Sequence, residues 1–180
     1  MALTATVYTF EVELSDVDRG VYESLTFKAA QHPSETNEFL VTRVLAYCLE
    51  YGEGIAFSKG LDDPDEPALV VRDLTGAMRV WIDIGNPDAA RLHKASKATP
   101  RVVIYTHKDP DRLLRQMAGE RIHRRDAIEI RAVDRELIDQ IAQRLDRRMR
   151  FGLSVTDGHL YVTIAGETLE GSVERMSLPG

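Results

Sequence analysis

Cysteine is nearly absent from this sequence of 180 residues, which contains only Cys48. A single cysteine excludes an intramolecular disulfide and a cysteine-rich zinc site, and it fits a reducing compartment. Long apolar runs are missing too, since no stretch reaches the roughly 18 residues that a membrane span needs. The N-terminal MALTATVYTFEVEL also lacks the basic start and continuous apolar centre of a signal peptide. The sequence therefore predicts a cytoplasmic protein without a membrane-spanning segment.

Several catalytic motifs are absent as well. The sequence has no glycine-rich phosphate loop, no serine nucleophile-elbow motif and no paired-histidine zinc motif, and its five histidines are scattered. The net charge of -6 at pH 7 argues against a protein that coats nucleic acid by bulk electrostatics, although it leaves room for a local basic groove. With 43% hydrophobic residues the chain can bury one core, and we expect a single domain over residues 1–180.

The stretch over residues 65–97 carries the strongest local signals. Two short runs rich in β-branched and aromatic residues, 68–71 and 80–84, predict strands, and 73–76 supplies the residues of a tight turn between them. The second run contains Asp83. Because an unpaired carboxylate is costly to bury, Asp83 should either face an opening or meet a cation or a metal.

A basic helix is predicted directly after this strand. Residues 86–88 form a helix start, with an asparagine that can cap, a proline at the first helical position and an acid in the first turn. The helix then carries cations three residues apart, on roughly one side: Arg91, Lys94 and Lys97. Two interpretations stay open. The stripe is a solvated helix face with Asp83 as a structural ion-pair partner, or it turns cations towards Asp83 as part of a site.

Antiparallel strands are predicted at both ends of the chain. Residues 7–14 alternate between apolar and polar side chains and should pair in a hairpin with residues 22–29. Near the C-terminus, the sequence at 157–158 is Asp-Gly, a strong hairpin turn. Between these ends, the patterns at 101–105 and 128–133 predict two further strands. The fold class is therefore α/β with a mixed sheet.

Three further helices are predicted. Ser34 is expected to cap a helix that runs to about Tyr51, and the acids and proline of residues 109–111 begin a second helix that ends at Gly119. The third helix is expected over residues 135–149.

Acids near the apolar core are candidate metal ligands. Glu38 lies three residues before Val41 and so continues the buried face of the first helix, although a first-turn acid that complements the helix dipole explains it equally well. The loop before the first central strand carries four acids: Asp62, Asp63, Asp65 and Glu66. Mg²⁺ needs only one or two protein carboxylates and keeps several waters, so this loop is either a polar connection or part of a metal site.

The order of these elements resembles a known nuclease core. The helix with Glu38, the acidic loop, the hairpin ending in Asp83, the crossover helix and the buried strand look like the αβββαβ core of the PD-(D/E)xK nuclease superfamily. More closely, HPSETNEF, GLDDPDEP, DLTG, WIDIG and RLHKAS, together with the opening MALTATVY, resemble the bacterial YaeQ family over essentially the full length. The resemblance implies a restriction-endonuclease-like α/β core, here with antiparallel β-hairpins added at both termini. It implies no reaction, because the YaeQ family has no established activity.

The resemblance also implies roles for individual residues. Glu66, or its neighbour Asp65, stands for the first acid of the nuclease motif and Asp83 for the second, and these acids would hold Mg²⁺ or Mn²⁺. Glu38 stands for the helix acid that assists the metal in some members. Arg91 would contact a substrate phosphate, with an exposed helix charge as the alternative.

Two positions depart from the nuclease motif. Gly85 stands where the motif has its lysine, and Ala68 stands where an acid is preferred. The following helix can supply the missing cation, with Lys94 as the first choice for the catalytic lysine and Lys97 as the reserve or as a second contact to substrate.

Two functions follow from this placement. In the first, a metal held by the two carboxylates activates a water for phosphodiester hydrolysis and neutralises the charge that develops, while the lysine positions the water. In the second, the same fold binds a protein or nucleic-acid partner without cutting it. The missing lysine at Gly85 favours the second reading, and acids at core-facing positions favour the first.

Overall fold

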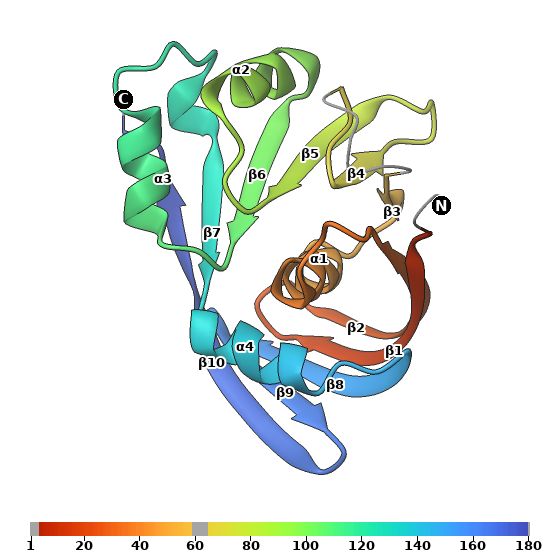
Figure 1. Ribbon diagram of the computed structural model, residues 1–180. Coiled ribbons are helices and arrows are strands. Elements are labelled where there is room, and N and C mark those ends of the chain that lie inside the picture. The colour runs from red at the N-terminus through yellow and green to blue at the C-terminus, as the bar shows by residue number, and fades with distance from the viewer. Residues whose placement is uncertain (1–3, 59–64, 180) are drawn as a thin grey trace. The chain divides into compact units, whose positions relative to one another are not determined.

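The computed structural model describes residues 4–58 and 65–179 and shows a mixed α/β fold (Figure 1). Its contacts divide the chain into two compact units. The first unit comprises Met1–Val44 and Val133–Val173, and the second comprises Leu45–Ala132 and Glu174–Gly180. The expectation of a single domain stays a prediction.

Among the described residues, the first unit contains four whole strands, most of a fifth, the start of one helix and the whole of another. They are β1 (Thr6–Asp16), β2 (Val21–Gln31), α1 (Asn37–Leu49), α4 (Arg135–Gln143), β8 (Arg148–Thr156), β9 (His159–Ile164) and β10 (Glu167–Ser177). The strands are ordered β2-β1-β8-β9-β10. Strands β1 and β8 are parallel, whereas β1–β2, β8–β9 and β9–β10 are antiparallel.

The second unit is built around three parallel strands. Its elements are β3 (Ile55–Phe57), β4 (Leu69–Arg72), β5 (Met78–Ile84), α2 (Ala89–Ala98), β6 (Arg101–Thr106), α3 (Pro110–Met117), the 3₁₀ turn η1 (Arg125–Ala127) and β7 (Glu129–Val133). The strand order is β7-β6-β5-β4-β3. Helices α2 and α3 connect the parallel strands β5, β6 and β7, and β4 and β3 extend the sheet with antiparallel pairs.

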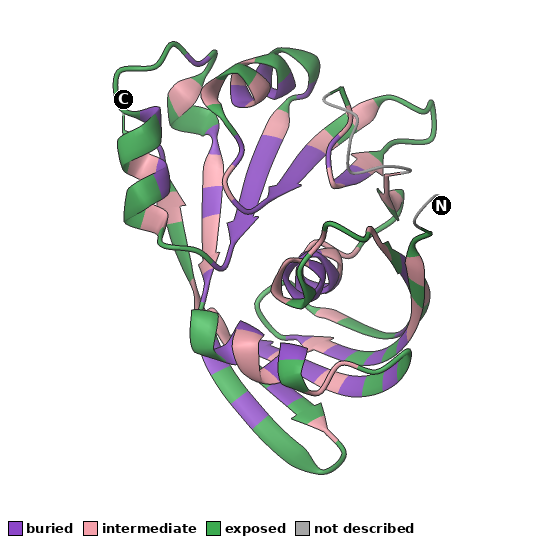
Figure 2. Ribbon diagram, in the orientation of Figure 1, coloured by how far each residue is buried: buried purple, intermediate pink, exposed green. Residues whose placement is uncertain are grey.

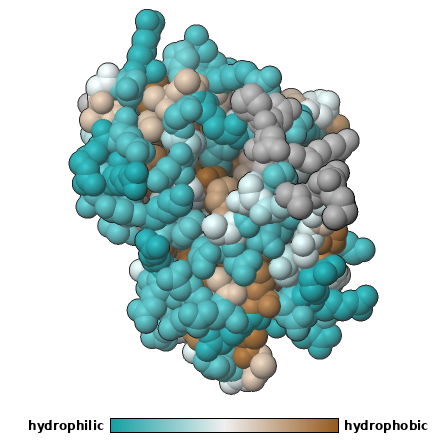
Figure 3. Space-filling model, in the orientation of Figure 1, coloured by the Kyte–Doolittle hydropathy of each residue, from teal (hydrophilic) through white to brown (hydrophobic). Residues whose placement is uncertain are grey.

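The two units bury their strands differently (Figure 2). Strand β6 is buried at every position from Val102 to Thr106, as expected for a parallel strand that is covered on both faces. Strand β8 alternates between exposed and buried residues, because one of its faces is solvated. Hydrophilic side chains cover most of the face shown in Figure 3.

The main apolar core of the second unit lies between the parallel strands and helices α2 and α3. Its buried members come from β5, α2, β6, α3, the segment before β7, β7 itself and the C-terminal segment: Trp81, Leu92, Ala95, Val102, Ile104, Leu113, Met117, Ile122, Ile128, Ile130 and Leu178. Trp81 is the largest of them, and it is only 2% exposed. This core fixes the position of β5 against α2, and therefore of the acid and the cations that these two elements carry.

Several predictions from the sequence are confirmed. The N-terminal hairpin forms between β1 and β2, and Asp157 and Gly158 turn the chain between β8 and β9 with positive φ angles of 50° and 73°. The two strands around the turn at 73–76, the helix that follows them and the strand predicted at 101–105 form as β4, β5, α2 and β6. None of the described helices is long and apolar enough to cross a membrane.

The predicted helix over residues 135–149 is too long. Helix α4 ends at Gln143, and β8 begins at Arg148. The apolar residues from Met149 onwards recur with a period of two and pair with β1. They therefore form a strand instead of continuing the helix. The arginines at 148 and 150 are therefore residues of β8.

Two predicted helix caps are also wrong. Helix α1 begins at Asn37 rather than near Ser34, because the hydroxyl of Thr36 accepts a hydrogen bond from the backbone N–H of Phe39 (3.1 Å). Helix α2 begins at Ala89, and its cap is Asp88 rather than Asn86. In both cases the chain offers several capping side chains in succession, and the later one satisfies the first free N–H groups.

Candidate functional site

The end of β5 and the first turn of α2 place an acid and an arginine together. Gly85 leaves the strand with φ of 84°, and its N–H donates to the carbonyl oxygen of Tyr105 (2.8 Å). The carboxylate of Asp88 then caps α2 by accepting from the N–H of Arg91 (2.8 Å). A lysine at position 85 would be strained at this positive φ, so the local backbone favours glycine at this position.

The guanidinium group of Arg91 holds both oxygens of Asp83. Its Nε donates to Oδ2 at 2.8 Å, and its Nη2 donates to Oδ1 at 3.0 Å. Nη2 also donates to the main-chain carbonyl oxygen of Glu66 at 2.6 Å. The Asp83 side chain is 4% exposed and that of Arg91 is 24% exposed. Three oxygens thus converge on one cation, in the bidentate geometry that makes arginine–carboxylate pairs strong.

An aromatic ring completes the surroundings of Arg91. The guanidinium carbon lies 5.2 Å from the centre of the Trp81 ring, within the range of a cation–π interaction. Trp81 and Asp83 are two residues apart on β5 and so share one face of the strand. Among the described residues, the buried Nε1 of Trp81 and Oδ1 of Asn86 have no hydrogen-bond partner.

The other predicted site residues of the second unit are arranged differently. Glu66 contributes its main-chain oxygen to Arg91. Lys94 forms an ion pair with Asp65, and both side chains are more than half exposed. Lys97 is exposed one turn further along α2. The structure therefore brings Asp83, Arg91 and the backbone of Glu66 together, and it pairs the proposed catalytic lysine with the alternative first acid.

The remaining candidate ligands are not part of this cluster. Glu38 is half-buried in the first turn of α1, in the first unit, and its main-chain oxygen accepts from the hydroxyl of Thr42 (2.8 Å). Asp62 and Asp63 lie outside the described residues. Within residues 4–58 and 65–179, no group of three or more His, Cys, Asp or Glu side chains is placed to hold a metal ion.

Basic side chains gather on an exposed part of the second unit. The backbone N–H of His123 donates to Nδ1 of His93 (3.0 Å), and this bond ties the segment before η1 to α2. We call His93, Lys97, Arg121 and His123 the basic face. The pKa of His93 lies below its ordinary value, because its imidazole ring is partly buried and because Lys97, Arg121 and His123 carry positive charge nearby. A site with surplus positive charge is what an anion requires.

Two neighbouring arginines have a structural role instead. Arg124 donates from Nη2 to the carbonyl oxygens of Ser96 (2.9 Å) and Thr99 (3.1 Å) at the end of α2. Arg125 donates from Nε to the carbonyl oxygen of Pro179 (2.5 Å). The basic run of the sequence is thus divided, with Arg121 and His123 on the exposed face and the next two residues bonded to backbone.

Sequence reasoning missed a polar network on the other face of the parallel strands. Its members are Glu50, Arg101, Tyr105, Glu129 and Arg131. Arg101 donates from Nε to Glu129 (2.6 Å) and from Nη1 to Glu50 (2.8 Å), and the buried hydroxyl of Tyr105 donates to Glu50 (2.7 Å). Burial and the Glu50 charge raise the pKa of Tyr105 well above its ordinary value. The signal available in the sequence was the two-residue alternation of a strand, which places Arg101 and Tyr105 on the same face of β6.

Sequence reasoning also missed a buried ion pair in the first unit. Arg43 donates from Nε and Nη2 to the two carboxylate oxygens of Glu35 (both 3.1 Å), and from Nη2 to the carbonyl oxygen of Ala30 (2.7 Å). The side chains of Arg43 and Glu35 are only 4% and 1% exposed. This pair ties the segment after β2 to α1.

The fold and this site define a mixed α/β protein with a buried, arginine-held carboxylate between a parallel strand and its crossover helix. The chain belongs to the YaeQ family, because the family model described as YaeQ protein matches residues 1–173. It is 27% identical over 180 residues to the uncharacterized protein YaeQ of Escherichia coli K12, covering 99% of each chain. It is 28% identical over 171 residues to the Salmonella typhi protein of the same description, covering 94% of each.

Two crystal structures of YaeQ proteins have the same fold. The Xanthomonas axonopodis pv. citri protein is 31% identical with a TM-score of 0.88, and the match covers 98% of this chain and all of the other. The Pseudomonas syringae protein is 32% identical with a TM-score of 0.86, and the match covers 97% of each chain.

Proposed function

We propose that this chain is a restriction-endonuclease-like protein that binds nucleic acid without hydrolysing it. The order of α1, β3, β4, β5, α2 and β6 supports the nuclease-like placement. The observation that carries the non-catalytic role is the fork of Arg91 on Asp83, because the guanidinium group fills the position where a metal would contact that acid. A cytoplasmic location stays a prediction, supported by the single buried cysteine, Cys48.

The energetics favour the arginine over a metal at this position. Separating a buried carboxylate from its arginine costs about 3–5 kcal/mol when both are sealed from water, and less here because Arg91 is partly exposed. A Mg²⁺ ion held by one carboxylate and a main-chain oxygen keeps most of its waters, so it gains little binding free energy from these two ligands. The residues around Asp83 therefore suit one cation, and Arg91 already supplies it.

The basic face supports the nucleic-acid part of the proposal. Lys97 and Arg121 are exposed cations beside two histidines, and neither has an ion pair in the part of the chain that the structure describes. Phosphate contacts of this kind give affinity that depends on salt rather than on base sequence.

Fluorescence anisotropy with a labelled duplex DNA tests this proposal. Reversal of both cations, Lys97→Glu with Arg121→Glu, should weaken binding about tenfold or more and lower the slope of log affinity against log salt by about two. The matched control reverses two exposed arginines outside the face, Arg112→Glu with Arg135→Glu, for the same change in net charge. Equal loss in both variants, or no binding by the natural protein, contradicts the proposed face.

Metal-dependent phosphodiester hydrolysis is the second candidate. The convergence of three oxygens, from Asp83 and Glu66, on one cation favours it. In this case Asp83 and Glu66 would hold Mg²⁺ or Mn²⁺, and Arg91 would leave Asp83 to contact a substrate phosphate. The metal would supply an activated water and charge neutralisation.

The same candidate gives Lys94, or Lys97, the task of positioning the water, with Glu38 in support. DNA cleavage that needs Mg²⁺ or Mn²⁺ tests it. Cleavage should be lost in Asp83→Asn and kept in the matched surface variant Asp126→Asn. Cleavage that survives Asp83→Asn contradicts this site.

A further inference from the structure

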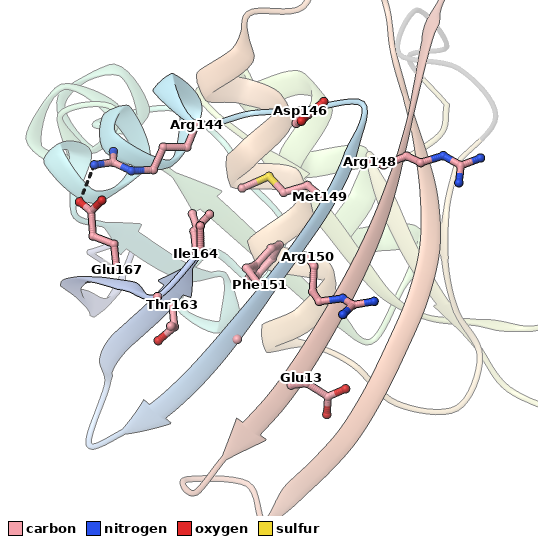
Figure 4. Close-up of a pocket in the computed structure, with 13 residues that line it drawn as sticks. Glu13, Arg144, Asp146, Arg148, Met149, Arg150, Phe151, Thr163, Ile164 and Glu167 are labelled. Carbon is pink, nitrogen blue, oxygen red and sulfur yellow. Dashed lines mark hydrogen bonds and ion pairs between the residues drawn. The ribbon is translucent and has the colours of Figure 1, made fainter.

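A groove with a volume of about 760 Å³ runs along the first half of β8 in the first unit (Figure 4). Side chains from both faces of this strand line it, including Phe151 from the buried face and Arg150 from the exposed face. A groove lined by both faces of a strand lies beside the strand rather than over it. Its volume is within the range of small-ligand and peptide sites.

The groove exists because β9 is shorter than β8. Strand β1 pairs with β8 from Arg148 to Val155, but β9 pairs with β8 only from Gly152 to Thr156. The chain then turns away through Ala165 and Gly166, which have positive φ angles of 50° and 81°. Residues 148–151 consequently have a neighbouring strand on one side only.

The open side presents backbone hydrogen-bonding groups. The carbonyl oxygens of Arg147 and Val155 accept from β1 and the residue that follows it, so the backbone groups of odd-numbered residues face β1. Those of even-numbered residues face the other way, towards β9. Arg148 and Arg150 lie where β9 is missing, and an unpaired edge of this kind is a template for another strand.

The groove is lined by apolar side chains and by charged side chains of both signs, with Glu13, Asp146 and Glu167 as the acids. Met149 and Phe151 belong to the buried face, and Ile164 at the end of β9 lies across the groove from them (Figure 4). Arg148 and Arg150 project on the opposite face of β8. Arg150 pairs with a glutamate of β1 (2.7 Å), whereas Arg148 has no ion pair among the described residues.

We propose that this edge of β8 binds an extended segment of a partner protein, which adds as an antiparallel strand in line with β9. Its apolar side chains would face Met149, Phe151 and Ile164, and its acidic side chains would lie on the face that carries Arg148, which has no ion pair among the described residues. Alternating valine and glutamate is the simplest sequence that fits both faces. This site belongs to the first unit and is independent of the proposed nucleic-acid site.

An extended peptide fits the groove better than the sheet of a second copy. The open edge spans only residues 148–151, with the turn after β9 at one end and the ion pair between Arg144 and Glu167 (2.6 Å) among its lining residues. Backbone bonds give such a segment its affinity, and alternate side chains give it specificity.

The test measures anisotropy of a labelled peptide with alternating glutamate and valine. In an antiparallel pair, the residues directly opposite Arg148 and Arg150 share their face and exchange both backbone bonds with them. Those residues are the glutamates. N-methylation of the glutamates should therefore abolish binding, and N-methylation of the valines, whose N–H groups point away from β8, should leave it within about twofold.

The variant Arg148→Glu tests the charge. It should weaken binding of the unmodified peptide about fivefold, because a like charge replaces an opposite one across the strands. The matched control Arg112→Glu should bind as the natural protein does. Absence of binding, equal effects of the two methylation patterns, or a concentration-dependent dimer that Arg148→Glu dissociates would each overturn the proposal.

Discussion

Two arginine–carboxylate pairs of this protein are built alike and differ in their access to water. Glu35 and Arg43 in the first unit, and Asp83 and Arg91 in the second, are each eight residues apart in the sequence. In each pair the guanidinium group bonds both carboxylate oxygens and also donates to a main-chain carbonyl oxygen. The two pairs therefore have the same hydrogen-bonding pattern.

The surroundings separate a structural pair from a candidate site. The Arg43 side chain is 4% exposed, whereas that of Arg91 is 24% exposed and stacks on an aromatic ring. Burial raises the pKa of Glu35 even though Arg43 lowers it. A sealed pair can only hold the fold together, while a partly open one can exchange its cation. The acids of both pairs are buried, so the exposure of the arginine side chain is what distinguishes the candidate site from the structural pair.

The largest expected effect comes from breaking the sealed pair. Arg43→Ala leaves Glu35 buried without its cation and should lower the free energy of unfolding by about 3–5 kcal/mol, measured by urea denaturation at neutral pH. As a control, the double variant Glu35→Gln with Arg43→Met removes both charges and should recover part of this loss. A cost below about 1 kcal/mol for Arg43→Ala would contradict the structural role.

The pH dependence of this variant has a definite sign. An acid whose folded-state pKa is raised above its ordinary 4.5 binds protons more readily in the folded chain, so stability falls as the pH rises above that value. Removal of Arg43 raises the pKa of Glu35 further. The destabilisation by Arg43→Ala should therefore be smallest near about pH 5 and larger near about pH 8.

The open pair should tolerate the same change better. Arg91→Ala should cost about 1–3 kcal/mol, because water can reach the carboxylate of Asp83 where the guanidinium group was. Arg91→Lys keeps the charge but cannot form the fork, so its cost should lie between those of the natural protein and Arg91→Ala. If Arg91→Ala destabilised the protein as much as Arg43→Ala, the distinction between the two pairs would not hold.

The smallest expected effect concerns the ring that only the second pair has. A double-mutant cycle of Trp81→Leu and Arg91→Ala should give a coupling energy of about 0.5–1 kcal/mol from the cation–π contact, because leucine has no π face. The Nε1 of Trp81 has no hydrogen-bond partner among the described residues, so leucine breaks no bond there. A coupling energy of zero would mean that the ring only fills the core.

Local patterns predicted the elements of the fold well. The alternation in β1 and β2, the Asp-Gly turn at 157–158 and the run of β6 each determine their own structure, because side-chain period and turn chemistry are local. The end of α4 was not predicted, since pairing of β8 with β1 joins residues more than a hundred positions apart. Such pairing overrides local helix signals.

The site was predicted in part. The cost of burying Asp83 left an opening, a cation or a metal as alternatives, and the sequence pattern did not say that the partner would be Arg91. The sealed pair was missed, because Arg43 interrupts an apolar helix face in the sequence and its acid lies before the helix. The role of Gly85 depends on a φ angle, and this angle becomes visible only once β5 is joined to α2.

Titration of Mg²⁺ and Mn²⁺ by calorimetry tests most directly whether Arg91 fills the cation position of Asp83. We expect no saturable binding to the natural protein, binding to folded Arg91→Ala, and loss of that binding in Arg91→Ala with Asp83→Asn. Saturable binding of either metal by the natural protein that is lost in Asp83→Asn would contradict the account and favour the hydrolase.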